Sequence, residues 1–562
     1  MTRQQVLGPL VALLPRRSDY EGLSRSWRAD LVAGLTVGVV ALPLALAFGI
    51  SSGLTAEAGL ITAVVAGLVA AVFGGSDVQV SGPTGAMTVV LVPVVARHGA
   101  DAVLVVSLLA GVLVVAAALA RLGRFLAYVP WPVIEGFTIG IAVIIFLQQV
   151  PSALGVAKPE GENTALVAVE AVGDALDHGS PASLGVVALV VALLVVLPRI
   201  RRALPASLIA VVAATVVAEV ADLDVARIGA LPGSLPAPSL PGLSVSQISE
   251  LLSAAFAVAV LAALESLLSA KVADGMTGGR PHDPDRELFG QGLANLASPL
   301  FGGMPATGAI ARTAVNVRSG ARTRVAAAVH ALVLLVVVLT ASDLVGRIPL
   351  AALAGVLMVT AVRMVEVHNV RAVVRATRSD ALVLGVTAVA TVAFDLIVAV
   401  QIGVAVAVVL ALRHVARNAQ IVPVPIPRPP AGTGPDREAT EDLLHEGIVV
   451  YRLDGALFFG AAQRFLTELT QVSDAKVVVL ALPDLQVLDA TGAQALGEIV
   501  SELEERGITV LLKGPRPEHL RILDATGALA RLRTQHHLFS NLDDALAHAH
   551  RHAAEGDHAV SR

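Results

Sequence analysis

The sequence predicts a polytopic α-helical membrane protein of about fourteen spans, followed by a small cytoplasmic α/β domain. The chain is 55% hydrophobic and only 15% charged, and its mean hydropathy of +0.76 is typical of integral membrane proteins. Apolar stretches recur from about residue 30 to residue 413. By contrast, residues 441–562 hold 11 Lys and Arg against 18 Asp and Glu, which indicates a separate acidic unit.

The first 29 residues form an Arg-rich N-terminal segment, which we expect to be cytoplasmic. This segment has no apolar stretch followed by a small-residue cleavage site, so we expect no cleavable signal peptide. The chain has no Cys, which excludes disulfides and thiolate metal sites. The sequence contains no P-loop, nucleophile–base set or metal motif. We therefore expect no enzyme activity, no cofactor, no metal and no nucleic-acid partner.

The transmembrane domain is expected at residues 30–418. Its spans centre near residues 40, 65, 88, 110, 141, 190, 212, 260, 295, 312, 333, 355, 388 and 405. Basic residues favour the cytoplasmic ends of spans. With the N-terminus inside, the loops after even-numbered spans carry 16 arginines and the opposite loops only four basic residues. This asymmetry favours an even number of spans with both termini cytoplasmic.

Seven spans lie on each side of about residue 235, which predicts a 7+7 inverted repeat. The third span of each half is broken: residues 81–88 read SGPTGAMT and residues 303–310 read GMPATGAI. A helix break at membrane depth frees backbone N–H groups, which are tolerated only inside protein or beside a wet cavity. A helix N-terminus there attracts anions. The paired breaks therefore predict an anion site between two opposed helix N-termini.

Two ionisable residues lie inside predicted spans, where a charge is costly and marks a functional site by default. Glu265 shares a helix face with Ser269, so the pair can bind a cation, or the carboxyl can carry a proton. Arg312 follows the second break and can place a fixed positive charge beside an anion. The alternative for each residue is a structural pairing with a neighbouring helix.

The C-terminal part begins with a Pro-rich linker at residues 419–440. Its residues 421–437 read IVPVPIPRPPAGTGPDR, which excludes a regular helix. Apolar runs at 448–453, 477–482 and 508–512 alternate with helical patterns at 461–472 and 492–506. This alternation predicts an α/β domain at residues 441–548. A His-rich tail, residues 549–562, has no ordered ligand spacing and is expected to be solvated.

The chain resembles the SulP (sulfate permease) family of anion transporters, and its C-terminal part is similar to a STAS domain. The matching segments are FGGSDVQVSGPTGAM at 73–87, VIEGFTIGIAVIIFLQQVP at 133–151, ALESLLSAKVADGMTG at 263–278 and ATGAIARTAVNVRSGART at 306–323. The resemblance implies core and gate domains, an elevator-like movement of the core, and a homodimer in the lipid bilayer. It also implies a small inorganic or organic anion as substrate.

The resemblance also assigns residues to roles. The implied substrate-binding residues are Phe48, Thr84, Gly85, Ala86, Met87, Gly308, Ala309, Ile310 and Arg312. The implied coupling-ion residues are Glu265 and Ser269, with Gly308, Ala309 and Ile310 beside them in sodium-binding members.

Several positions depart from the family pattern. Leu44 follows Pro43 where many members have Gln, and Ala311 precedes the arginine where mammalian members have Ser. Glu265 and Ser269 stand where sodium-coupled members have Asp and Thr, which favours proton coupling. In the STAS-like part, Ala490 replaces the phosphorylated Ser of stand-alone relatives.

The leading hypothesis is therefore a proton-coupled symporter for sulfate, bicarbonate or a C4-dicarboxylate in the inner (plasma) membrane. A sodium-coupled bicarbonate symporter and an anion exchanger remain alternatives. A more distant alternative is a membrane sensor that does not transport and signals through the STAS-like domain.

Overall fold

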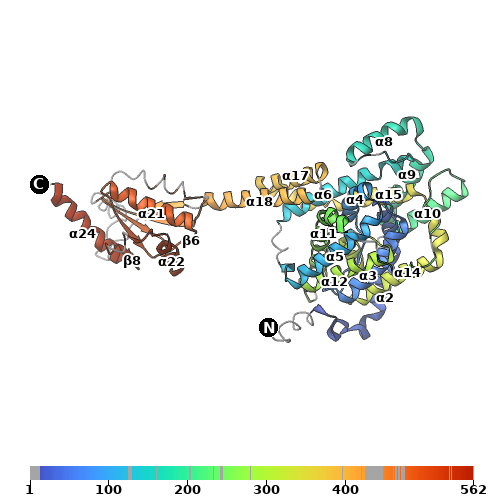
Figure 1. Cartoon of the computed structure of the whole chain (residues 1–562), viewed down its shortest axis with the longest axis horizontal. Coiled ribbons are helices and arrows are strands. Elements are labelled where there is room, and N and C mark those ends of the chain that lie inside the picture. Colours follow the sequence, from blue (N-terminus) through green and yellow to red (C-terminus); the bar gives the residue numbers. More distant parts are fainter. Residues whose placement is uncertain are drawn as a thin grey trace. The chain divides into compact units, whose positions relative to one another are not determined.

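The computed structural model describes most of the chain (Figure 1). The described residues are 13–124, 130–159, 161, 163–201, 204–231, 233–240, 245–278, 280–394, 396–418, 420–423, 447–459, 461, 462, 465, 467, 469, 475–530, 532 and 535–560. The chain divides into two compact units, residues 1–405 and 406–562.

The first unit is helical. Its first half contains a short 3-10 turn, Arg17–Tyr20, and nine helices: α2 (Leu23–Ser51), α3 (Ala56–Phe73), α4 (Gly85–His98), α5 (Asp101–Leu119), α6 (Trp131–Gln148), α7 (Val150–Leu154), α8 (Thr164–His178), α9 (Pro181–Ile200) and α10 (Ala206–Val220) among the described residues. The second half contains α11 (Val245–Thr277), α12 (Pro284–Ala297), α13 (Ile310–Arg318), α14 (Val325–Gly346), α15 (Leu350–Met364), α16 (Val367–Ala376), α17 (Arg378–Ala393) and the start of α18 (Leu396–Asn418). Helix α18 continues past residue 405 into the second unit.

All fourteen predicted span centres lie within helices of this unit. In the described part of the chain, eight helices are long and apolar enough to cross a membrane, and three shorter ones, in α4, α10 and α18, are also apolar. Helix α2 begins at Leu23, within the predicted N-terminal segment. Helices α12 and α13 are short and carry many buried polar residues, so the sequence is only weakly apolar near residues 295 and 312.

Small residues let the helices of the first unit approach closely. At the crossing of α2 and α3, a Cβ atom on Gly59 would come within 2.1 Å of the Ala45 carbonyl oxygen. A Cβ atom on Gly49 would come within 2.3 Å of the Thr55 carbonyl oxygen. Only glycine fits at these two positions, and the tight crossing fixes the part of α2 that carries Phe48.

The second unit contains a mixed sheet ordered β3–β4–β5–β7–β8, with β6 paired to the end of β4. The strands are β3 (Gln420–Pro423), β4 (Ile448–Leu457), β5 (Val477–Ala481), β6 (Leu485–Leu488), β7 (Thr509–Lys513) and β8 (Leu538–Phe539). Strand β3 runs antiparallel to β4, and the other pairs are parallel. The three apolar runs form strands β4, β5 and β7, as the alternating pattern predicts. The helix predicted at 492–506 is confirmed as α21 (Ala490–Glu505).

Helices cover both faces of this sheet. Val478 and Leu512 pack in one apolar cluster with residues of α21 and α22 (Pro517–Ala525). Val479 and Leu511 pack in another cluster with Ala549 of α24 (Leu542–Val560). Neighbouring strand residues point to opposite faces, so the two clusters lie on opposite sides of the sheet.

Two expectations for this unit were wrong at their boundaries. Residues 420–423 of the predicted linker form strand β3, because their backbone pairs with residues 451–454 of β4. The predicted solvated tail from residue 549 is part of α24, since Ala549 and Ala553 are buried against the sheet. Residues 424–440 of the linker and most of the helix expected at 461–472 lie outside the described residues.

Candidate functional site

The two broken segments meet in a short antiparallel ribbon. Strand β1 (Ser81–Gly82) pairs with β2 (Thr307–Gly308), with Ser81 opposite Gly308 and Gly82 opposite Thr307. Helix α4 starts at Gly85 and α13 at Ile310, so both begin directly after the ribbon. Because the two strands are antiparallel, the helices leave the ribbon in opposite directions. The two helices therefore begin at opposite ends of the ribbon, and the N-terminus of each faces it.

Neither helix N-terminus is capped by a side chain. Thr84 and Ala309 occupy the N-cap positions of α4 and α13, and neither makes a side-chain cap hydrogen bond. The first N–H groups of a helix have no partner within the helix and carry the positive end of the helix dipole. Two such ends at one place form an electropositive region.

A stripe of polar residues on α12 holds the ribbon in place. Glu287 Oε2 accepts hydrogen bonds from the backbone of Gly75 at 2.8 Å and Ser76 at 3.1 Å. The Glu287 Oε1 atom accepts hydrogen bonds from Gln79 at 2.8 Å and from Gln291 at 2.9 Å. These contacts anchor the segment that leads into β1.

The same stripe continues toward both strands of the ribbon. Gln291 Nε2 donates to Ser81 Oγ at 2.6 Å. The Asn295 amide donates to the Ala306 carbonyl oxygen at 2.8 Å and accepts from the Ala306 N–H at 2.9 Å. This stripe was not predicted from the sequence. Its signal is the i, i+4, i+8 spacing of Glu287, Gln291 and Asn295 in a weakly apolar span, which places the three on one helix face.

Arg312 lies on the first turn of α13 and is only 2% exposed. Its Nη2 atom donates to the carbonyl oxygen of Pro83 in the opposite break. Its Nη1 atom has no hydrogen-bond partner among the described residues. This atom faces Gly82, where an added Cβ would lie 2.6 Å from it. Arg312 therefore links the two breaks and keeps one buried donor group unpaired.

Glu265 lies on α11 and is half-buried. Its Oε2 atom accepts a hydrogen bond from Thr84 Oγ1 at 2.8 Å. The Glu265 and Arg312 charges interact electrostatically. The structure thus brings together three of the predicted site residues, Thr84, Glu265 and Arg312, from three different spans.

The two serines near Glu265 have different partners. Ser269 is fully buried, and its hydroxyl pairs with Thr313 Oγ1 at 3.0 Å. Ser266 was not predicted, yet its Oγ atom accepts from the Gly308 N–H at 2.9 Å and lies 2.9 Å from Thr307 Oγ1. Ser266 therefore fixes the second break against α11, whereas Ser269 holds the body of α13.

The remaining predicted residues surround the two N-termini. Phe48, Ala86, Met87, Gly308 and Ala309 are buried, and Ile310 is 40% exposed. At Gly85, an added Cβ would lie 2.2 Å from Ile145 Cδ1 and 3.3 Å from Phe48 Cε1. This close packing brings Phe48 of α2 against the start of α4.

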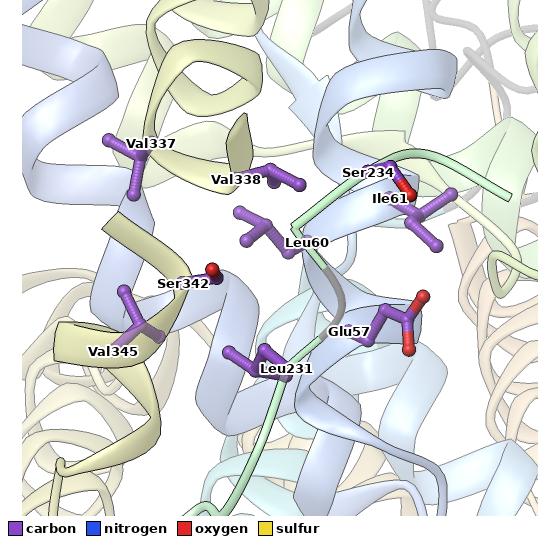
Figure 2. Close-up of a pocket in the computed structure, with 9 residues that line it drawn as sticks. All are labelled: Glu57, Leu60, Ile61, Leu231, Ser234, Val337, Val338, Ser342 and Val345. Carbon is purple, nitrogen blue, oxygen red and sulfur yellow. The ribbon is translucent and has the colours of Figure 1, made fainter. Parts of the chain in front are cut away.

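Figure 2 shows a pocket elsewhere in the first unit, between α3, α14 and the segment near Leu231. Its cavity volume is ≈ 10 Å³, which is the space of about one water molecule. The lining is mostly aliphatic, with Glu57, Ser234 and Ser342 as its polar members. None of the predicted site residues lines it, and it is too small for a polyatomic anion.

Known protein families match both parts of the chain. Residues 27–387 match the sulfate permease family, and residues 441–545 match the STAS domain. The chain belongs to the sulfate permease family. It is a multi-pass membrane protein with a C-terminal STAS domain.

Curated relatives of this sulfate permease family member are named as transporters rather than enzymes. The chain is 36% identical to the putative sulfate transporter YvdB of Bacillus subtilis over 91% of this chain and 96% of the relative. It is 32% identical to the bicarbonate transporter BicA of a Picosynechococcus strain over 96% of this chain and 98% of the relative.

Two solved structures support the fold. The transmembrane domain of a cyanobacterial bicarbonate transporter, BicA, matches with a TM-score of 0.61 at 34% identity, over 68% of this chain and 98% of that chain. SLC26A9 matches with a TM-score of 0.81 over 99% of this chain and 95% of that chain. At 18% identity, the second likeness shows the fold alone.

Proposed function

We propose that this chain is a secondary active transporter that moves a small anion by proton-coupled symport. The substrate is sulfate, bicarbonate or a C4-dicarboxylate, and the names of the relatives favour the first two. The observation that carries the proposal is the buried guanidinium of Arg312, whose Nη1 atom is unpaired beside two uncapped helix N-termini.

An anion completes this arrangement. An unpaired buried charge is costly, and the cost is offset when a counter-charge accepts its hydrogen bonds. The guanidinium offers a fixed positive charge, and the helix ends offer oriented N–H groups. Backbone N–H groups do not distinguish strongly among oxyanions, so the site selects charge and size rather than one chemical identity.

Glu265 supplies the coupling. When ionised, its carboxylate partly neutralises the positive field of Arg312, with which it interacts electrostatically. A proton on Glu265 removes that negative charge and strengthens the field that attracts the anion. By thermodynamic reciprocity, a bound anion strengthens proton binding by the same factor. Proton and anion are therefore bound and released together.

The remaining features of the proposal rest on the family resemblance and the arginine pattern. We place the protein in the inner (plasma) membrane with both termini cytoplasmic, because the 16 to four distribution of basic loop residues favours this orientation. The core carries the site across by an elevator-like movement, and the protein forms a homodimer.

Transport into proteoliposomes tests this function. We expect labelled sulfate or bicarbonate to accumulate under an inward proton gradient. Glu265→Gln should abolish that accumulation, because a glutamine amide does not gain and lose a proton as a carboxyl group does. The matched control is Glu170→Gln on α8, an exposed residue. Full gradient-driven accumulation by Glu265→Gln would remove the carboxyl from coupling.

Other results identify the alternatives. Uptake that requires external sodium indicates a sodium-coupled symporter. Uptake stimulated by the same anion inside the vesicle indicates an exchanger. Calorimetry against sulfate, bicarbonate, fumarate, succinate and chloride identifies the ligand, and binding without flux indicates a sensor.

A further inference from the structure

Three histidines gather at one edge of the STAS domain, far along the chain from the anion site. His537 precedes β8, and His548 and His552 lie one turn apart on α24, which packs beside β8 (Figure 1). Their ring centroids are 5.4 Å apart for His537 and His548, 5.3 Å for His537 and His552, and 4.8 Å for His548 and His552. Each ring therefore contacts the other two.

The fold brings the three rings together for identifiable reasons. Ala545, Ala549 and Ala553 form the buried stripe of α24, and their small size lets the helix lie close to the sheet. His548 and His552 each precede one of these alanines, so both lie at the border of the buried face. A helical i, i+4 pair is a favourable geometry for two imidazole ligands of one metal.

His537 is held in place by its own backbone. Its carbonyl oxygen accepts from the Leu512 N–H at 2.9 Å, and its N–H donates to the Leu532 carbonyl oxygen at 2.8 Å. The residue is only 5% exposed, and its Nδ1 atom has no hydrogen-bond partner among the described residues. A buried polar atom without a partner is costly and calls for a ligand.

The nitrogen positions suit a tetrahedral metal ion. His548 Nε2 and His552 Nε2 lie 3.2 Å apart. Zn–N bonds of about 2.0–2.1 Å at tetrahedral angles place two ligand nitrogens about 3.3 Å apart. One ligand atom from each of the three histidines lies within 4.8 Å of the others, so a small movement of the His537 ring closes the site.

We propose that His537, His548 and His552 form a transition-metal site, with Zn²⁺ as the ion that fits it best. Three imidazoles suit a borderline ion such as Zn²⁺, and a fourth coordination position remains for water or another ligand. The ion joins the C-terminal helix to the edge of the sheet. Its binding therefore stabilises the packing of α24 on the STAS domain.

Arg551 must move for the site to form. Its Nη2 atom lies 2.8 Å from His548 Nδ1. A metal on Nε2 leaves the proton on Nδ1, which then no longer accepts a hydrogen bond from the guanidinium. Arg551 is exposed and free to turn into solvent. We expect Arg551→Ala to bind the metal at least as tightly as the wild type, because a nearby positive charge is removed.

Calorimetry tests the site on the full-length protein, purified without a polyhistidine tag and stripped with a chelator. We expect one Zn²⁺ per chain, and a loss of affinity of about 100-fold or more for His548→Gln or His552→Gln, since each removes one of three ligands. The control is His550→Gln, an exposed histidine of the same helix, which should bind like the wild type. Equal affinity in all variants, or an equal loss in His550→Gln, would overturn the proposal.

A second measurement needs no variant. Co²⁺ in place of Zn²⁺ should give the intense visible absorption of a tetrahedral nitrogen site in the wild-type protein. Zn²⁺ should also slow hydrogen–deuterium exchange across residues 542–553, because it ties α24 to the sheet. A weak octahedral Co²⁺ spectrum with unchanged exchange would contradict the site.

Discussion

Thr84 donates a 2.8 Å hydrogen bond to Glu265, which joins the N-cap residue of α4 to α11. The N-cap position of α4 makes no side-chain cap hydrogen bond, because its hydroxyl serves the carboxylate instead. The N–H groups of α4 are thereby left for another ligand. One hydrogen bond thus connects the proposed coupling residue to the proposed anion site.

This contact predicts the effect of Thr84→Val, which keeps the side-chain shape and removes the hydroxyl. A hydrogen bond to a charged group contributes about 1.5–3 kcal/mol, so proton-driven uptake should fall by roughly ten- to hundredfold. Uptake by proteoliposomes under an inward proton gradient measures it. Thr84→Ser keeps the hydroxyl and should transport normally; equal rates for the valine and serine variants would show that the hydrogen bond is not needed.

Arg312 predicts a loss of anion binding. Removal of one partner of a buried charge pair costs about 2–5 kcal/mol, so Arg312→Ala should weaken binding by about 30-fold or more. Arg312→Lys should give only partial recovery, because an ammonium lacks the planar fork that contacts Pro83 and a ligand together. Calorimetry with the transported anion measures both. Arg318→Ala, an exposed arginine of the same helix, is the control, and unchanged affinity in Arg312→Ala would place the arginine outside the site.

Glu287 predicts a structural effect that reaches the site. Glu287 is 1% exposed, and its carboxylate accepts four hydrogen bonds from N–H groups. In Glu287→Gln, the amide NH₂ group would face some of these N–H donors and could not accept their hydrogen bonds. We expect a loss of about 1.5–3 kcal/mol of stability. Thermal unfolding in detergent should show a lower midpoint temperature. Calorimetry below that temperature should show weaker anion binding. The exposed Glu170→Gln serves as the comparison, and an unchanged midpoint for Glu287→Gln would contradict the anchoring role.

His519 predicts a pH dependence of the STAS domain. It lies on α22 and is 2% exposed, and burial lowers its pKa below the ordinary value of 6.5. The unfolded chain therefore takes up more protons than the folded chain as the pH falls below 6.5, and stability decreases with falling pH. His519→Leu should reduce that decrease.

Hydrogen–deuterium exchange of β5 and β7 in the full-length protein, corrected for the intrinsic rate, measures this stability between pH 7.5 and 5.5. The exposed His550→Gln should keep the wild-type pH dependence. If His519→Leu also keeps it, the buried histidine is not the source.

Much of the fold could be predicted because its signals are local. All fourteen span centres lie in helices, since apolar length alone marks a membrane helix. The boundaries were less predictable. Residues 420–423 lie in a Pro-rich run, and only their pairing with β4 makes them a strand.

By itself, the sequence determined the two helix breaks, the buried Arg312 and the intramembrane Glu265. Proline, glycine and an ionisable residue are each unfavourable in an apolar span, so they can be recognised from the sequence without knowledge of their contacts. The tertiary structure alone decided which groups meet. Ser269 shares a helix face with Glu265 but pairs with Thr313, and Ser266 holds Gly308. Helical spacing sets the direction of a side chain. The partner of that side chain depends on which segment packs opposite it, and the packing of segments depends on the whole transmembrane fold.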